Sequence, residues 1–296
     1  MNTVLTQQYT RHDLAKIDKS KYTKEEYRRL REQKRLRRQQ AEFEKLREEN
    51  LKTFYPDGPP NNVLCLKHGQ KYNADYVNKL YNMVSRNTTV PFKMHCITED
   101  SGGIDPNINI IPLPEIPKDQ NVNGWWYKPY IYSKELPIDG TILYFDLDIV
   151  VCANIDKLFD FYPGKYCALR DFTRSMRPGW QKYNSTVVRF ERGQLDFVWT
   201  EFIKNPKAVM RRHFGDQDWL WEKTNGMAQY FPDQWIRSWK WEIRKDKTWK
   251  PGGVKGNRTF KTIENATPPE HCCIVAFHGD PNPHNCYDPY IIDNWK

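Results

Sequence analysis

The chain has 296 residues, of which 39% are hydrophobic and 14% aromatic, so it can bury a core and is not a disordered protein. Its 46 Lys and Arg outnumber its 37 Asp and Glu, and residues 1–55 hold fifteen of these bases against nine acids. No apolar run approaches the roughly twenty residues of a membrane span, and no apolar segment follows the early basic residues as in an export signal. We therefore expect a cytoplasmic protein with a basic N-terminal arm.

The sequence predicts one long polar helix over residues 20–53, which contain no Gly or Pro. Thr23 and Glu26 have the spacing of a capping box at its start. One interpretation is a solvated helix stabilised by its own charge pairs, and the other is an arm that contacts a polyanion such as nucleic acid. The breaker-rich stretch at residues 55–62 then separates an arm (1–55) from a main domain (62–296).

Short apolar runs alternate with helical stretches through the main domain. We predict strands at Val63–Lys67, Phe92–Thr98, Asn109–Leu113, Thr141–Phe145, Tyr166–Arg170, Ser185–Phe190 and Cys273–Phe277. We predict helices at Ala74–Arg86, Trp125–Ser133 and Gln194–Ile203. This alternation indicates an α/β fold with a mixed, mainly parallel sheet flanked by helices.

The seven cysteines are odd in number, and Cys65, Cys96, Cys152 and Cys167 lie in or beside apolar runs, so we expect buried free thiols. A zinc site built from His271, Cys272, Cys273, His278, His284 and Cys286 is a weaker alternative, since no Cys-x-x-Cys spacing supports it.

Two carboxylates follow the most apolar predicted strand directly. Asp146 and Asp148 stand two residues apart at the end of Thr141–Phe145, where α/β sheets bind their ligands. Carboxylate oxygens suit Mn²⁺ or Mg²⁺, which in turn bind phosphate oxygens. We interpret the pair as a metal site, in preference to two solvated acids in a turn. His278, at the end of the last predicted strand, is the candidate third ligand.

Two further polar segments are ambiguous by themselves. Asp216, Gln217 and Asp218 stand at the head of a helix-like run and could position an acceptor hydroxyl, although simple N-capping by Asp216 is the better explanation of this segment taken by itself. Asn184 and Ser185, which precede a predicted strand, are similarly ambiguous.

Taken in chain order, the predicted elements and these polar motifs resemble a glycosyltransferase of the GT-A (Rossmann-like) fold, most closely family 8. The resemblance covers about residues 62–286. The resemblance implies a hexosyl- or pentosyltransferase that uses a UDP-sugar and Mn²⁺ or Mg²⁺, with retention of configuration. It implies metal binding by Asp146, Asp148 and His278, and catalytic roles around the donor sugar for Asp216, Gln217 and Asp218. It also implies donor contacts by Lys67, Tyr72, Lys128, Asn184, Ser185, Gly279 and His284.

One departure concerns the C-terminal motif of that family, which ends in a lysine that binds the leaving diphosphate. Here His284 stands where the lysine is expected, and Gly279 is shifted. Retention of configuration therefore transfers less directly than the metal site does.

Two alternatives and one combination stay open. Asp146 and Asp148 also fit the start of a haloacid-dehalogenase-type phosphatase, with a nucleophile and an acid/base, although three predicted strands precede them here. A non-enzymatic basic nucleic-acid-binding protein would explain the arm. A transferase with such an arm suggests a hydroxylated base in DNA as acceptor, as in phage-infected bacterial cells.

Overall fold

The computed structural model describes residues 22–28, 31, 61–116, 122, 124–177, 179–244 and 267–296. Within the arm, the predicted capping box is present. The Thr23 amide donates to Glu26 Oε2 at 2.9 Å, and the Glu26 amide donates to Thr23 Oγ1 at 3.3 Å. The rest of the helix predicted over residues 20–53 lies outside the described residues, apart from residues 24–28 and 31.

A seven-stranded sheet forms the centre of the main domain, in the order β3-β2-β1-β4-β7-β6-β8. Strands β3, β2, β1 and β4 are parallel, and β7 is antiparallel to both β4 and β6. The strands are β1 (Asn61–Lys67), β2 (Lys93–Thr98), β3 (Asn109–Ile111), β4 (Thr141–Phe145), β6 (Cys167–Arg170), β7 (Tyr183–Glu191) and β8 (Gln229–Tyr230). The predicted mixed, mainly parallel α/β fold is confirmed.

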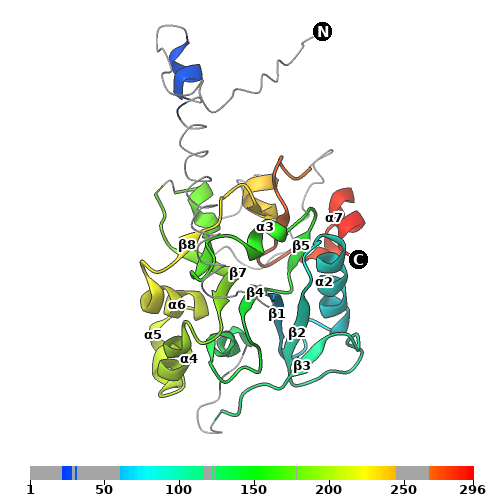
Figure 1. The fold of residues 1–296 in the computed structure, drawn as a ribbon, viewed down its shortest axis with the longest axis vertical. Helices are drawn as coiled ribbons and strands as arrows, with labels where there is room; N and C mark the ends of the chain where they lie inside the picture. The colour runs from blue at the N-terminus through cyan, green and yellow to red at the C-terminus, as the bar shows by residue number, and fades with distance from the viewer. Residues whose placement is uncertain are drawn as a thin grey trace.

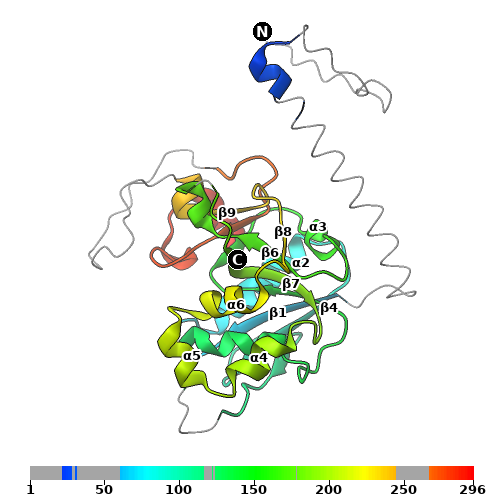
Figure 2. The same cartoon turned by 90° about the vertical axis from the view of Figure 1, so that its left-hand side faces the viewer.

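Each face of this sheet packs against its own hydrophobic core, because successive side chains of a strand point to opposite faces. Val63 and Leu143 belong to one core, and their chain neighbours Leu64 and Ile142 belong to the other. The first core is covered by α2 (Ala74–Arg86), and the second by η3 (Gly124–Tyr132), α4 (Asp196–Phe202) and α6 (Asp216–Thr224). Figures 1 and 2 show α4, α5 (Pro206–Arg212) and α6 grouped together, and in Figure 1 this group lies across the sheet from α2.

Three further strands form a second, smaller sheet, which begins with the strand that follows β4 in the chain. It has the order β5-β10-β9, with β5 at Ile149–Val151, β9 at Ile236–Ser238 and β10 at Ile274–Ala276. Strand β10 is antiparallel to β5 and parallel to β9. This sheet therefore brings the C-terminal part of the chain next to the segment that follows β4.

Several elements differ from the sequence prediction. The helix predicted at Trp125–Ser133 is a 3₁₀ helix with Pro129 inside it. The sequence did not predict several short elements, because their patterns span too few residues. Among them are the strands β5, β8 and β9 and the helices α3 (Asp156–Phe159), α5 and α7 (Pro289–Asn294). The same holds for η4 (Phe172–Ser175), η6 (Pro283–Asn285) and the π-helix η5 (Trp239–Ile243).

All seven cysteines are free, as predicted, and six of them are buried, whereas Cys152 is half-buried. The zinc alternative gains no support, because the described residues contain no group of three His, Cys, Asp or Glu side chains that could hold a metal ion. Nor does any helix in the described part of the chain have the length and apolar character needed to cross a membrane.

Candidate active site

The site is built where the parallel strands β1 and β4 reach their carboxyl ends side by side. Asp146 follows β4 directly, and its amide donates to the carbonyl of Thr186 at 2.9 Å. This hydrogen bond holds the Asp146 backbone next to β7. The carbonyl of Asp148 accepts from the amide of Phe277 at 2.9 Å, just beyond β10. Both sheets thus fix the backbone of the two aspartates, and the position at this edge follows from the strand order.

Lys128 is the centre of the cluster. Its side chain is buried, and Nζ lies 2.7 Å from Asp146 Oδ1, 3.1 Å from Ser185 Oγ and 3.8 Å from Asp216 Oδ2. Burial alone would lower the pKa of Lys128, but the charges of Asp146 and Asp216 outweigh it and the pKa is raised. The structure therefore keeps a charged ammonium group between the carboxylates of Asp146 and Asp216.

Asp148 lies close enough to Asp146 for the two charges to interact. Burial, and then the charge of Asp146, raises the pKa of Asp148 to about 6. The Tyr72 hydroxyl donates to Asp148 Oδ2 at 2.9 Å, and burial raises the pKa of Tyr72 so that it stays a donor. Two neighbouring carboxylates with this repulsion are a fitting oxygen donor set for a hard divalent cation.

Asp216 occupies the first turn of α6, but it does not cap the helix. The N-cap residue is Gly215, so the N-capping interpretation of Asp216 is wrong. Its Oδ2 instead accepts from Ser185 Oγ at 3.0 Å, and burial raises its pKa. The charge of Lys128, whose Nζ lies 3.8 Å from Oδ2, opposes this effect of burial.

Asp171 is a site residue that was not predicted from the sequence. Its Oδ2 accepts from Gln217 Nε2 at 3.1 Å and from Asn184 Nδ2 at 3.3 Å. Because the carboxylate binds both NH₂ groups, the amide oxygen of Gln217 is turned away from Asp171. A single Asp after the short strand β6 belongs to no motif, and its position at a strand end was the only available signal.

His278 is not gathered with the two aspartates in this structure. Its Nε2 shares a hydrogen bond of 2.6 Å with Ser238 Oγ, and its ring stacks on Phe172 with a centroid distance of 5.5 Å. Burial, and then the charge of Lys240, lowers the pKa of His278 to about 4, so the imidazole is neutral. The described residues offer no three-ligand set, and the metal role of His278 stays a prediction.

The other predicted residues lie at the margins of the cluster. Lys67 Nζ donates to the carbonyl of Asp100 at 3.1 Å, and Asp218 pairs with Lys182 at 3.1 Å on the surface. Gly279 has a φ of +75°, and a Cβ there would lie 3.8 Å from Lys240 Nζ. The exposed His284 binds the Tyr76 hydroxyl through Nδ1. Among the described residues, no direct contact joins these four residues to Lys128, Asp146, Ser185 or Asp216.

We expect Asp171→Asn to reduce the sugar transfer that the sequence resemblance implies by about tenfold to a hundredfold, because the variant has only one accepting oxygen. The wild-type carboxylate accepts from Asn184 and Gln217 with Oδ2 and from the Thr173 amide with Oδ1. The loss should appear in kcat and leave the affinity for the bare nucleoside diphosphate unchanged. Steady-state kinetics together with calorimetric titration of the diphosphate measures the two quantities separately. A variant that loses diphosphate affinity instead would contradict this role.

No protein-family model matches the sequence, and the curated proteins include no similar sequence. Among solved structures, the glycosyltransferase GlyE of Streptococcus pneumoniae TIGR4 is similar with a TM-score of 0.52 and 15% identity, over 79% of this chain and 62% of that chain. The WbbM bifunctional glycosyltransferase in its apo form is similar with a TM-score of 0.53 and 13% identity, over 80% of this chain and 50% of that one. This chain thus spans about three-fifths or less of their lengths. At these identities the likeness shows the fold, which is that of GT-A-like proteins.

Proposed function

We propose that this protein is a metal-dependent glycosyltransferase that moves a sugar from a nucleotide sugar, first of all a UDP-sugar, to an acceptor hydroxyl. One observation carries the proposal. A buried, charged Lys128 lies among Asp146, Ser185 and Asp216 at the carboxyl edge of a GT-A-like sheet, with Asp148 beside them. A cation next to paired carboxylates at this edge suits a diphosphate that arrives with a divalent ion.

The leaving group is the first task of the site. Asp146 and Asp148 would hold Mn²⁺ or Mg²⁺, with His278 as the proposed third ligand. When bound, such an ion offsets the negative charge that builds on the departing nucleoside diphosphate. Lys128 would add a second, fixed positive charge, which works best in a buried site where water does not screen it. The sequence resemblance to family 8 implies the same roles, with the metal on Asp146, Asp148 and His278 and Lys128 in contact with the donor.

The donor sugar is the second task. Asp216 would accept hydrogen bonds from sugar hydroxyls, and Gln217 would present its amide oxygen, oriented by Asp171, to the sugar. Asn184 is bound to the same carboxylate and would line the same side. Retention of configuration is the outcome that the resemblance to family 8 implies, and Gln217, a neutral amide, would then face the anomeric carbon without acting as a base.

The phosphatase alternative is less well supported. In a phosphatase of that type the nucleophilic aspartate normally stands at the start of its domain, whereas β1, β2 and β3 precede β4 and Asp146 here. The likeness of the fold to glycosyltransferases favours transfer as well.

The direct test is a thermal-shift panel of nucleotide sugars, each with and without Mn²⁺. Under the proposal, one donor raises the melting temperature by several degrees when Mn²⁺ is present and by little when it is absent, because both partners bind only the folded state. UDP-glucose, UDP-galactose and GDP-mannose are the first donors, with Ca²⁺ as the control for a non-specific cation effect. A panel without any joint stabilisation would remove the proposal.

A further inference from the structure

Two exposed aromatic side chains flank the start of α6. Trp125 is 59% exposed and Phe214 is 94% exposed, the two largest exposed fractions among the tryptophans and phenylalanines of the described residues. We refer to this pair as the aromatic rim. Aromatic side chains bring a large apolar area to an interface, and exposed apolar surface beside a polar site can mark a place where a ligand binds.

The first rim residue, Trp125, belongs to the same helix as Lys128. Residues three apart eclipse one another on a 3₁₀ helix, so Trp125 and Lys128 lie on one face of η3. A Cβ built on Gly215 would lie 3.5 Å from the indole Nε1, which shows that Trp125 packs against the residue immediately before Asp216. The exposed indole therefore lies between solvent and the buried cluster.

The second rim residue, Phe214, precedes Asp216 by two positions. The backbone at Gly215 between them is extended, with φ −162° and ψ 174°. Phe214 is the chain neighbour of Gly215, against which Trp125 packs, and its ring is exposed beside that contact.

The charges at the rim select between possible ligands. Lys182 and Arg212 are paired with Asp218 and Glu222 at 3.1 and 2.7 Å. These pairs reduce the positive charge that a polyanion such as DNA would need there, whereas a neutral sugar needs none.

We propose that the aromatic rim is the acceptor site and that it takes a neutral saccharide, whose apolar ring face stacks on Trp125 and Phe214. The acceptor hydroxyl then faces Asp216 and the donor sugar. This assignment rests on the proposed function and names the acceptor class for it, in place of the hydroxylated DNA base that the basic arm suggested. The rim carries no part of the donor site.

The test uses the full chain on an array of neutral oligosaccharides that also carries DNA containing 5-hydroxymethylcytosine. We expect the wild type to bind a subset of the glycans, and Trp125→Ala and Phe214→Ala to weaken that binding about tenfold or more. Ile110→Ala is the matched control, because Ile110 is also exposed (42%) but lies on β3 at the far edge of the sheet. Binding of UDP with Mn²⁺, measured by calorimetry, should be equal in all four proteins.

The outcomes separate the two proposals. Glycan binding that survives both rim substitutions overturns the acceptor site, and so does a wild type that binds no neutral glycan. Binding of the modified DNA that both substitutions abolish also overturns it, since the rim would then receive a base. If UDP and Mn²⁺ fail to bind while the rim variants still lose the glycans, the proposed donor chemistry is wrong and the rim remains a saccharide site.

Discussion

Lys128→Met is expected to be inactive and to lose about 3 kcal/mol of unfolding free energy, because it leaves Asp146 and Asp216 buried without their cation. The methionine side chain is unbranched and only one atom shorter than that of lysine, so it leaves no large cavity and the loss reports mainly the charge. The estimate stands at the lower end for a broken buried pair, since the Asp146 side chain is 24% exposed.

Urea unfolding followed by circular dichroism measures this change at pH 7. The matched control is Lys182→Met, which removes an ammonium group from a surface pair with Asp218, where the side chains are 38% and 36% exposed. Exposed pairs contribute about 0–1 kcal/mol, so the control should unfold close to the wild type. Equal unfolding midpoints for the two variants would show that Lys128 does not compensate the buried acids.

Asp148→Asn should abolish the joint stabilisation by donor and Mn²⁺ and slow sugar transfer about a thousandfold. The amide removes the charge that a divalent cation needs, and a bound cation contributes several kcal/mol to a transition state in which a diphosphate departs. The amide oxygen of the variant can still accept from the Tyr72 hydroxyl, which donates to Asp148 at 2.9 Å in the wild type.

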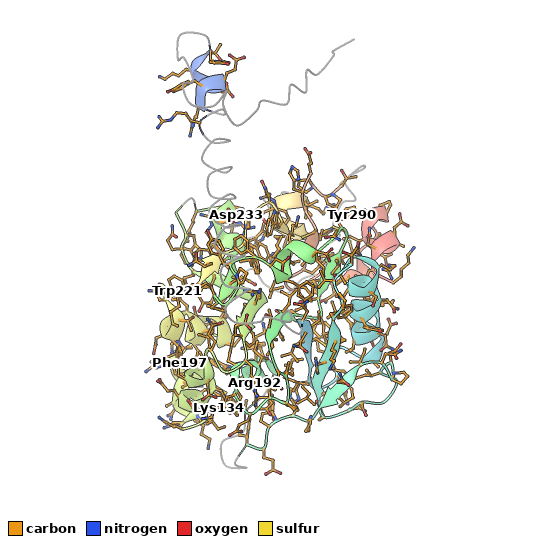
Figure 3. The ribbon with its side chains drawn as sticks, in the orientation of Figure 1. Lys134, Arg192, Phe197, Trp221, Asp233 and Tyr290 are labelled. Carbon is orange, nitrogen blue, oxygen red and sulfur yellow. The ribbon has the colours of Figure 1, made fainter. Side chains whose placement is uncertain are left out.

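The stability of the metal-free Asp148→Asn variant should not fall with its activity. Burial and the charge of Asp146 raise the pKa of Asp148 to about 6, so its ionised form is unfavourable in the folded state at pH 7. Replacing it with a neutral amide should therefore leave the melting temperature unchanged or raise it. Asp139→Asn is the control, because Asp139 is 85% exposed and pairs with Arg192 at the amino end of β4. Figure 3 shows Arg192 beside Lys134, at the other end of the molecule from Asp233 and Tyr290. Transfer at wild-type rates by Asp148→Asn would exclude metal binding at this aspartate.

The two variants separate two functions of one cluster. Lys128→Met should lower both stability and activity, whereas Asp148→Asn should lower activity alone. If the cluster only stabilised the fold, each variant would lose stability and activity together.

The sequence by itself predicted the elements whose pattern is complete within a few residues. Helix α2 begins and ends at the predicted residues, and so does β4. Each is long or apolar enough for its periodicity to be unambiguous. The edge position of Asp146 and Asp148 followed from the same local pattern, because charged residues directly after a buried strand must lie at the end of a sheet.

Only the tertiary structure decided which side chains meet. Lys128 joins Asp146 across eighteen positions, and Asp171 joins Gln217 across forty-six. Such pairs depend on strand order, helix type and burial, none of which leaves a periodic signal. Asp216 shows the difference clearly, since its sequence context is that of a helix cap and its partner in the fold is Ser185. Local periodicity determines where an element begins and ends, whereas the energy of an ionisable side chain depends on charges that only the folded chain brings near it.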